Sequence, residues 1–274
     1  MTGRSRVIEV QKYRANLRES RDDRVAIEEP LEIRLGYAAD GKRQTNSVSI
    51  TMRTPGDDEN LATGFLFSEG IIHSHADLAI VKPCDGDNTV RVELEDGVAV
   101  DLERLQRHFY TTSSCGVCGK ASLDALYAQG VAPLDAGGFV LPPDVLIRIP
   151  ERLRARQDTF DKTGGLHAAA AFDASGELIV VCEDIGRHNA VDKVIGALLR
   201  NDRLPASELG LMVSGRASFE LVQKALVAGM PLLAAVSAPS SLAVQLAREF
   251  NVGLVGFLRG DTFNVYAGKE RIAG

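Results

Sequence analysis

The sequence predicts an α/β protein in which an antiparallel β-rich domain is followed by an α/β domain. Up to about residue 110, apolar and polar residues alternate in paired short runs, a pattern typical of hairpins. After residue 144, short apolar runs alternate with amphipathic stretches of helical length, a pattern typical of strands joined by helices. We therefore expect a β-rich domain over residues 1–110, a cysteine loop and linker over 111–143, and an α/β domain over 144–274.

The first expected hairpin is followed by a short helix. Apolar residues alternate with polar ones over residues 31–35 and again over 48–52, on either side of an Asp40-Gly41 turn. One of the aspartates in Asp57-Asp58 can cap the helix that follows, and Gly70 is expected to end it.

A second hairpin is expected near the end of the first domain. Residues 90–94 and 98–102 each alternate, and Asp96-Gly97 lies between them. Asp-Gly is a strong signal for a tight turn between paired strands, so we expect these two runs to pair with each other.

The second half predicts strands connected by helices. Connections of helical length imply parallel neighbouring strands. The expected strands cover residues 166–172, 178–182, 211–213, 232–236 and 254–258, and the expected helices cover 189–200, 217–228 and 241–250. Residues 131–143, which contain three prolines and two adjacent glycines, predict the linker between the halves.

Composition argues against several classes of protein. The net charge is −6, whereas nucleic-acid-binding domains usually present a basic surface, so we expect no nucleic-acid partner. The longest apolar stretch, residues 225–238, contains Gly229 and Pro231 and is shorter than the ~20 residues that a membrane span needs. Residues 1–24 lack the apolar region of a secretory signal. We expect a cytoplasmic protein with no membrane segment.

Cys115 and Cys118 are the strongest candidates for chemistry. They lie in a stretch of small and polar residues, 111–120, whose glycines keep the backbone accessible. The helical pattern that follows, up to Gly130, places Cys118 near a helix N-terminus, where exposed N–H groups favour a thiolate. Lys120 adds positive charge. Because the thiolate is the nucleophile, we expect this pair to be reactive.

Three kinds of chemistry use two cysteines at this spacing: a zinc site, a dithiol redox pair and a sulfur relay through a persulfide. A structural zinc needs four ligands and the chain has no second such pair, but a catalytic zinc needs only one more ligand, from His167 or His188. A zinc-dependent nucleobase deaminase carries His-x-Glu, and Ala169 stands where that glutamate would be. The spacing alone leaves the three chemistries open.

The expected strands of the second half end in small, polar or cationic residues. In open parallel sheets, ligands bind beyond the carboxyl ends of the strands, where helix N-termini offer N–H groups to phosphate oxygens. Serine and aspartate there are most often helix caps. Arginines and a histidine among four such turns favour an anionic, nucleotide-like ligand. The turns are Ser214-Gly215-Arg216, residues 237–241, Arg259-Gly260-Asp261 and residues 183–188.

Individual histidines and cysteines are expected to differ in role. His188 has polar neighbours and is expected to face a ligand, whereas His167, at the start of a strand, is equally well explained as a hydrogen-bonded core residue. Cys182 follows an apolar run and is expected to be buried in a strand, and Cys84 is expected in a turn.

Five colinear motifs follow one another along the chain: Ser-Cys-Gly-Val-Cys-Gly at 114–119, Gly-Gly-Leu-His-Ala-Ala-Ala at 164–170, Glu-Asp-Ile-Gly-Arg-His-Asn-Ala-Val-Asp-Lys at 183–193, Val-Ser-Gly-Arg-Ala-Ser at 213–218 and Leu-Val-Gly-Phe at 254–257. Together they closely resemble those of the formate dehydrogenase accessory sulfurtransferase family. The resemblance extends from Phe65 to Tyr266, which is most of the chain.

The resemblance implies a sulfur carrier in the cytoplasm. Such a protein accepts sulfur as a persulfide from a cysteine desulfurase and passes it to molybdenum bis(molybdopterin guanine dinucleotide), which is then inserted into formate dehydrogenase. The α/β domain is expected to resemble the cytidine deaminase fold without its zinc ligands. By motif, Cys115 forms the persulfide and Cys118 is its partner, either releasing sulfide by attack on the persulfide or steadying it.

The resemblance also assigns residues that contact the molybdenum cofactor. The cofactor is expected to bind as a substrate, and the protein is expected to hold no metal ion of its own. Leu258 and Asp261 depart from the family pattern, so backbone contacts are expected in that segment. The segment is Phe257, Leu258, Arg259, Gly260, Asp261 and Thr262, and the guanine nucleotide arms are expected on Ser214, Arg216, Ser237 and Arg259, with His188 nearby. The alternatives are a zinc-dependent, deaminase-like hydrolase and a cofactor chaperone that uses no thiol. A homodimer is compatible with the sequence, which does not fix the oligomeric state.

Overall fold

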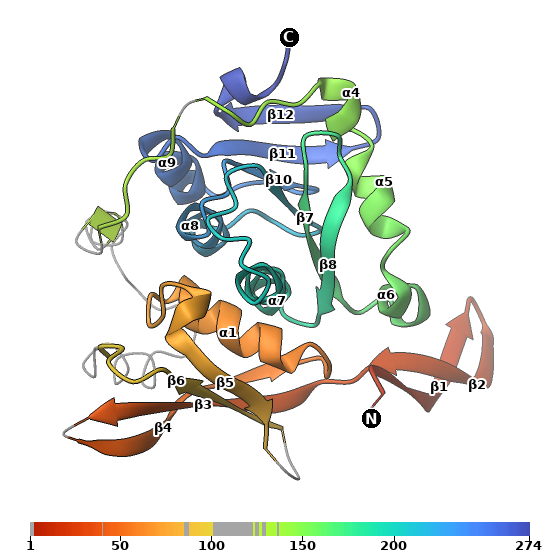
Figure 1. Cartoon of the computed structure of the whole chain (residues 1–274). Helices are drawn as coiled ribbons and strands as arrows, with labels where there is room; N and C mark the ends of the chain where they lie inside the picture. The colour runs from red at the N-terminus through yellow and green to blue at the C-terminus, as the bar shows by residue number, and fades with distance from the viewer. Residues whose placement is uncertain are drawn as a thin grey trace.

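The computed structural model describes residues 3–39, 41–84, 88–100, 123, 126–127, 130–135 and 137–274. The strands in these residues form a two-stranded arm, a four-stranded sheet and a six-stranded sheet (Figure 1). The chain is therefore a mixed α/β protein whose β-rich N-terminal part precedes an α/β domain, as predicted. In the described part of the chain, no helix has the length and apolar character needed to cross a membrane.

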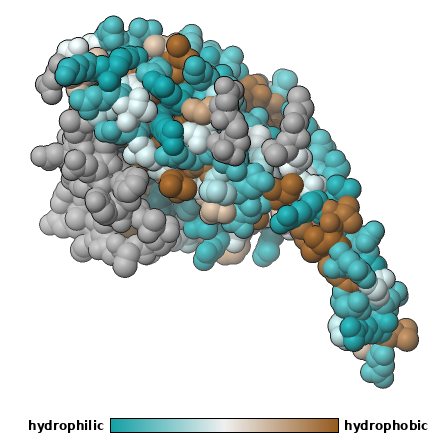
Figure 2. Space-filling view, turned by 90° about the horizontal axis from the view of Figure 1, so that it is seen from below, coloured by the Kyte–Doolittle hydropathy of each residue, from teal (hydrophilic) through white to brown (hydrophobic). Residues whose placement is uncertain are grey.

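The arm consists of β1 (Ser5–Arg14) and β2 (Leu17–Ala26), which pair antiparallel along their whole length. Every residue of both strands is exposed or half-buried, and the arm projects from one side of the molecule (Figures 1 and 2). No pattern in the sequence had predicted it.

The four-stranded sheet has the order β4-β3-β6-β5. The predicted first hairpin is confirmed as β3 (Glu29–Ala39) and β4 (Lys42–Arg53), which pair antiparallel. A register shift at Ile33/Arg34 turns Val48 inward and leaves Ile50 and Met52 exposed. The alternating run of β4 therefore does not present one continuous apolar face.

The predicted second hairpin is wrong. Residues 98–100 form no strand, and Leu102 lies outside the described residues. Instead β6 (Thr89–Leu94) lies between β3, to which it is parallel, and β5 (Leu78–Pro83), to which it is antiparallel. A central position buries Val90, Val92 and Leu94, which explains their apolar character without a hairpin partner.

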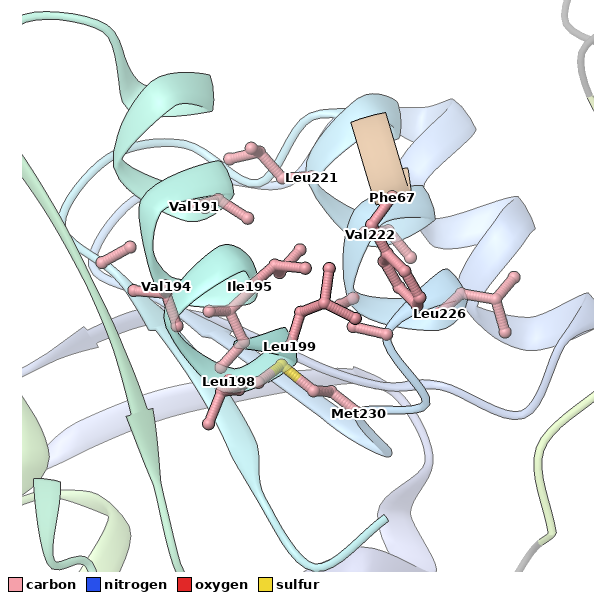
Figure 3. Packing of buried hydrophobic residues seen from close by; sticks show 14 of the residues in the cluster. Phe67, Val191, Val194, Ile195, Leu198, Leu199, Leu221, Val222, Leu226 and Met230 are labelled. Carbon is pink, nitrogen blue, oxygen red and sulfur yellow. The ribbon is translucent and has the colours of Figure 1, made fainter. Parts of the chain in front are cut away.

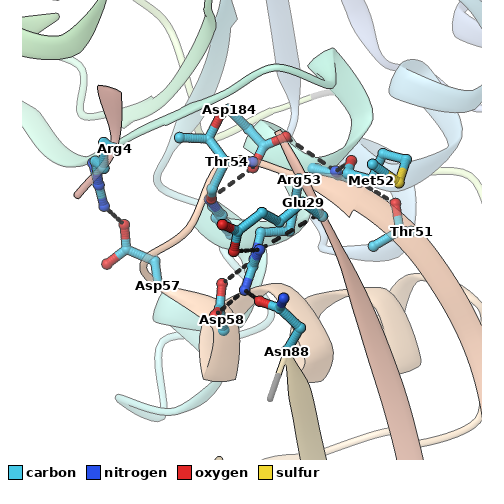
Figure 4. Close-up of polar contacts among 12 residues, drawn as sticks. Arg4, Glu29, Thr51, Met52, Arg53, Thr54, Asp57, Asp58, Asn88 and Asp184 are labelled. Carbon is cyan, nitrogen blue, oxygen red and sulfur yellow. Dashed lines mark hydrogen bonds and ion pairs between the residues drawn. The ribbon is translucent and has the colours of Figure 1, made fainter. Parts of the chain in front are cut away.

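The helix α1 (Asp58–Ser68) occupies the predicted position, with Gly70 just beyond its end at φ 65°. Its capping differs from the prediction. Asp57 at the N-cap has φ 58° and its side chain caps no helical N–H; its carboxylate contacts Arg4 instead. The Asp58 carboxylate accepts two hydrogen bonds of 2.9 Å from the guanidinium of Arg53 (Figure 4).

The six-stranded sheet confirms the predicted strands of the second half. Strands β9, β10 and β11 are parallel, β7 is antiparallel to β8 and β9, and β12 is antiparallel to β11. The order is β12 (Thr262–Ala267), β11 (Gly253–Arg259), β10 (Leu232–Ala235), β9 (Gly210–Val213), β7 (His167–Phe172), β8 (Leu178–Asp184).

Helices cover both faces of this sheet (Figure 1). The three predicted helices, α7 (Arg187–Leu199), α8 (Phe219–Val227) and α9 (Ser241–Glu249), pack with one set of alternating strand residues in the larger core cluster. The short helices α4 (Pro143–Leu146), α5 (Ile149–Arg154) and α6 (Asp158–Thr163) were not predicted. Residues of α4 and α5 pack with the opposite set of strand residues.

Two short 3-10 helices complete the elements, η1 (His75–Asp77) and η2 (Lys269–Arg271). Part of the predicted linker 131–143 belongs to the packed interior: Phe139 and Leu141 are buried, and Leu141 bridges to Ile272. The first residues of the α/β half are thereby anchored to the C-terminal end of the chain.

A single apolar core connects the four-stranded sheet with the helices of the larger sheet. Side chains from α1, α7 and α8 gather in one layer, among them Phe67, Leu199 and Leu226 (Figure 3). The backbones of α1 and α7 touch, because a Cβ on Gly64 would lie 1.8 Å from the carbonyl oxygen of Asp192 and one on Gly196 1.9 Å from that of Asn60. Glycine at both positions permits this close crossing.

Candidate functional site

The carboxyl ends of several strands lie together at one edge of the six-stranded sheet. Since β8, β9, β10 and β11 all run in the same direction, their carboxyl ends lie at this edge together with the first residue of the antiparallel β7, His167. Ligands of open α/β sheets bind at such an edge. The four turns that were predicted from the sequence to bind a ligand lie at the ends of these four strands.

A pocket of about 970 Å³ opens at this edge, between the strand ends and helices α5 and α6. This volume lies near the upper end of the range for small-molecule sites, about 300–1,000 Å³. The lining combines apolar side chains with a few cationic, acidic and polar ones: Pro150, Glu151, Leu153, Arg154, Ala155, Gln157, Phe160, Asp161, Gly164, Gly165, Leu166, His167, Ser214, Val236, Leu258, Arg259 and Gly260.

The structure brings four of the predicted cofactor residues to this pocket and leaves six outside its lining. The four are Ser214, Leu258, Arg259 and Gly260. The six are Phe257, Asp261, Thr262, Arg216, Ser237 and His188. Cys115 and Cys118 lie outside the described residues.

A bulge near the end of β11 determines how residues 257–260 are presented at the pocket. Phe257 has φ 54°, a left-handed conformation that is rare outside glycine, and the β11–β12 register shifts between Gly256 and Arg259. The Phe257 N–H donates a 3.1 Å hydrogen bond to the carbonyl oxygen of Ser237. As a result Leu258 is fully buried while Arg259 is exposed at the pocket. Ser237 and Phe257 thus hold the bulge rather than line the cavity.

Ser214 joins two strands and still faces the pocket. Its Oγ accepts a 2.9 Å hydrogen bond from the Ala168 N–H, and its own N–H donates to the Ala168 carbonyl oxygen at 2.9 Å. A serine hydroxyl that accepts one hydrogen bond can still donate its proton. Ser214 can therefore donate to an oxygen of a ligand in the pocket.

His167 lines the pocket at the start of β7. Burial lowers the pKa of its imidazole, and the positive charges of Arg187 and His188 lower it further. The imidazole is therefore mainly neutral at pH 7, with one nitrogen able to donate and the other able to accept.

Helices α5 and α6 form the wall that the sequence did not predict. The Arg154 guanidinium lies over the Phe160 ring, 4.6 Å from its centroid, and also pairs with the carboxylate of Asp161. The Glu183 carboxylate anchors α6 to β8 by accepting hydrogen bonds from the N–H groups of Thr159, at 2.9 Å, and Phe160, at 2.8 Å. Glu183 opens one of the motifs, and it is the sequence signal that could have pointed to this wall.

Other polar residues of the 183–193 motif build the joint with the N-terminal part. Asp184 Oδ2 lies 2.7 Å from Lys193 Nζ, with both side chains fully buried, and accepts from the Thr54 N–H at 3.1 Å. Lys193 also donates to the Thr54 carbonyl oxygen at 2.9 Å, and the Asn189 side-chain amide donates to the Met52 carbonyl oxygen at 2.8 Å. These side chains bind the fold together and do not line the pocket.

A second buried ion pair continues this joint. Lys224 Nζ of α8 lies 2.7 Å from Asp192 Oδ1 of α7, and the hydroxyl of Ser68 in α1 donates to the same carboxylate at 3.0 Å. Burial raises the pKa of Asp192, and the positive charge of Lys224 opposes that effect. Three helices are linked through this one carboxylate.

His188 and Arg216 do not contribute to the pocket lining. His188 Nε2 lies 3.5 Å from the Ser218 hydroxyl and 3.8 Å from the Glu220 carboxylate, both at the start of α8. Arg216 is exposed. The structure therefore places neither side chain at this pocket, although both were expected to face the ligand.

Cys84 and Cys182, the two cysteines in the part of the chain that the structure describes, do not line the pocket. Cys182 is buried in β8, as predicted, and burial raises the pKa of its thiol to about 12. Cys84 follows β5 and its N–H donates to the Thr89 carbonyl oxygen. Among the residues described by the structure, no three His, Cys, Asp or Glu side chains gather as a metal-binding group would.

Comparisons with known proteins agree over nearly the whole chain. The model of the FdhD/NarQ family matches residues 26–273. A protein of Streptomyces coelicolor named "Sulfur carrier protein FdhD" is 54% identical over 263 residues, covering 93% of this chain and 90% of the relative. A protein of the same name from Sulfurisphaera tokodaii is 44% identical over 265 residues, covering 97% and 98%.

A solved structure shares the fold. The crystal structure, named for a formate dehydrogenase accessory protein from Desulfotalea psychrophila, superposes with a TM-score of 0.78 at 25% sequence identity. The match covers 99% of this chain and 100% of the other. The arrangement of sheets and helices described above is therefore found in an experimental structure.

Proposed function

The chain belongs to the FdhD/NarQ family, and on that premise we propose that it is a sulfur carrier that serves formate dehydrogenase. Its relatives carry the name sulfur carrier. We propose further that the strand-end pocket binds the guanine-nucleotide end of molybdenum bis(molybdopterin guanine dinucleotide), which is the substrate that receives the sulfur.

The observation that carries this proposal is the position of Leu258, Arg259 and Gly260. They belong to the one segment that the family resemblance assigned to cofactor binding, and all three line the large pocket. The bulge at Phe257 presents them there. A segment that keeps a strained backbone at a ligand pocket is typical of functional sites.

The lining suits a nucleotide in chemical terms. Arg259 offers a guanidinium and Ser214 a hydroxyl, both of which are donors for phosphate oxygens. Pro150 and Phe160, both partly exposed, offer apolar surface for a flat base. The pocket therefore has an anion-binding side on the strand ends and an apolar side against α5 and α6.

The sulfur-transfer step falls to Cys115. Its thiolate attacks the terminal sulfur of a persulfide on a cysteine desulfurase; the S–S bond of the donor breaks, the donor cysteine leaves as a thiolate, and Cys115 carries the sulfur as a persulfide. Support for this role comes from the family motif at 114–119 and from the inertness of Cys182, whose buried thiol stays protonated.

The test is to incubate the purified protein with a cysteine desulfurase and cysteine and to measure its intact mass. We expect a gain of one sulfur atom in the wild type and in Cys182→Ala, and no gain in Cys115→Ala. Absence of the adduct from the wild type, or its persistence in Cys115→Ala, would refute the relay through Cys115.

Two further measurements separate the alternatives. If Cys115→Ala still activates formate dehydrogenase in cells lacking the wild-type protein, the chain is a thiol-independent cofactor chaperone. If freshly purified protein holds about one zinc per chain and loses it in Cys115→Ala, the cysteines are a metal site. We expect neither result.

A further inference from the structure

Gln157 is a buried polar residue at the wall of the strand-end pocket. It directly precedes α6, is 4% exposed and belongs to the pocket lining. Within the part of the chain that the structure describes, no hydrogen bond engages its side-chain amide. Most buried polar groups are hydrogen-bonded, because a buried donor or acceptor without a partner destabilises the fold. An unpartnered amide at a pocket wall therefore points to a polar group of the ligand.

The position of Gln157 at the N-cap of α6 does not explain its amide. A side chain at an N-cap usually accepts hydrogen bonds from the first N–H groups of the helix. Here the Glu183 carboxylate takes that role, since it accepts from the N–H groups of Thr159, at 2.9 Å, and Phe160, at 2.8 Å. The Gln157 side chain caps no N–H group, which leaves its amide free to bind a ligand.

Asp161 lies on the same face of α6 as Gln157. Residues four apart share a helix face, and the Asp161 N–H donates to the Gln157 carbonyl oxygen at 3.0 Å, as this spacing requires. Both residues line the pocket, with Gln157 buried and Asp161 exposed. An amide and a carboxylate thus follow each other from the inner to the outer part of this wall.

Arg154 positions the Asp161 carboxylate and leaves acceptor capacity on it. The guanidinium lies over the Phe160 ring and contacts a single carboxylate oxygen, Oδ1. Among the described residues, none pairs with Oδ2. Because an ionised carboxylate has about four acceptor positions, Asp161 can accept further hydrogen bonds from a ligand.

The charges of the pocket separate the two ends of a nucleotide. Arg259 and Ser214, at the strand ends, donate to phosphate oxygens, whereas the Asp161 carboxylate on α6 would repel them. The phosphates therefore belong at the strand ends, and the base belongs beside α6, where Phe160 offers apolar surface.

Guanine presents polar groups that complement this wall. On one edge of the base, O6 accepts hydrogen bonds, while N1–H and the amino group on C2 donate them. We propose that Gln157 and Asp161 select guanine: the Gln157 amide donates to O6, and the Asp161 carboxylate accepts from N1–H and the C2 amino group. This inference rests on the proposed function and names the residues that determine which base the pocket takes.

Adenine presents the opposite pattern at the same positions. It carries an amino group where guanine has O6, its N1 accepts a hydrogen bond, and its C2 has no amino group. The Gln157 amide can turn its oxygen toward the adenine amino group. Asp161 has no donor for N1, so its carboxylate would face another acceptor. Rejection of adenine therefore depends on Asp161.

Calorimetric titration of the whole protein with three nucleoside diphosphates tests the selection. Inosine diphosphate keeps O6 and N1–H but lacks the C2 amino group. We expect guanosine diphosphate to bind most tightly, inosine diphosphate more weakly, and adenosine diphosphate at least about tenfold more weakly than guanosine diphosphate. Equal affinity for the guanosine and adenosine nucleotides would overturn the selection but leave the nucleotide site standing. Binding of none of the three would overturn both.

Asp161→Asn tests the carboxylate. Its amide can donate to N1 of adenine, so the ratio of guanosine to adenosine diphosphate affinity should fall at least about tenfold. Asp144→Asn is the matched control, because Asp144 is also exposed on a short helix and pairs with an arginine, Arg148, but lies outside the pocket lining. This control should keep the wild-type ratio. An unchanged ratio in Asp161→Asn would overturn the proposal.

Gln157→Leu tests the amide. The change removes an unpartnered buried group, so the melting temperature should not fall, whereas the affinity for guanosine diphosphate should drop about tenfold. A residue that only supported the fold would show the reverse, a lower melting temperature with unchanged affinity. That reverse result would contradict the assignment of Gln157.

Discussion

Lys193 and Asp184 form an ion pair inside the protein, with 2.7 Å between Nζ and Oδ2 and no exposed surface on either side chain. The pair joins β8 and α7 to the Thr54 backbone that follows β4. Removing one partner would leave the other charge buried and uncompensated, and such a change strongly destabilises a folded protein. The joint between the two parts of the chain therefore depends on this pair.

Replacing Lys193 by Met tests this role. We expect Lys193→Met to lower the free energy of unfolding by about 3–5 kcal/mol, as measured by denaturant titration. Lys162→Met, which removes an exposed lysine, should change it by less than about 0.5 kcal/mol. A loss below about 1 kcal/mol in Lys193→Met would show that the buried carboxylate does not need its partner.

The crossing of α1 and α7 gives a second prediction. A methyl group on Gly64 would overlap the carbonyl oxygen of Asp192, so Gly64→Ala must force the two helices apart. We expect a loss of about 3 kcal/mol in the free energy of unfolding. Gly137→Ala is the matched control because a Cβ there meets nothing within 4 Å. Equal stability of the two variants would contradict the close crossing.

The lowered pKa of His167 predicts that this residue contributes to the loss of folding stability at acidic pH. Its folded-state pKa lies below the usual 6.5 because of burial and the charges of Arg187 and His188. Between 6.5 and that lower value the unfolded chain binds the proton more readily, so stability falls as the pH drops through this window.

Unfolding titrations across this pH range measure the effect. His167→Gln should lose this contribution to the pH dependence, whereas His73→Gln, which changes an exposed histidine, should keep it. Identical pH dependence of stability in wild type and His167→Gln would show that His167 titrates as it does in the unfolded chain.

Periodicity predicted strands β7 to β11 of the large sheet and the helices on one of its faces. Strands β7 to β11 and helices α7 to α9 lie within a few residues of their predicted positions, because helical and strand periods are set by which face is buried. The short helices α4 to α6 have four to six residues each, too few for a periodic pattern.

Strand pairing could not be predicted from local signals alone. Asp96-Gly97 does form a turn, but β6 pairs with β3 and β5. The apolar residues of β6 reflect its central place in the sheet, where they pack in one buried cluster with residues of α1. The exposed arm has no buried face, so it has no apolar period to detect.

The site was predicted in part. Strand direction places the turns after β8 to β11 at one edge, which is why Ser214 and Arg259 were found. The sequence could not tell which side chains at that edge face the pocket. Arg216 and His188 look equivalent to Arg259 in the sequence, yet Arg216 is exposed outside the lining and His188 lies beside α8. The wall containing Phe160 comes from a segment with no motif.

Calorimetric titration with guanosine diphosphate tests the central claim most directly, because this probe carries the base and the phosphates that the pocket is proposed to hold. We predict that the wild type binds it at one site per chain, that Arg259→Ala loses about 1.5–3 kcal/mol of binding free energy, and that Arg216→Ala binds like the wild type. Equal binding by Arg259→Ala and the wild type, or a loss confined to Arg216→Ala, would contradict the strand-end pocket as the nucleotide site.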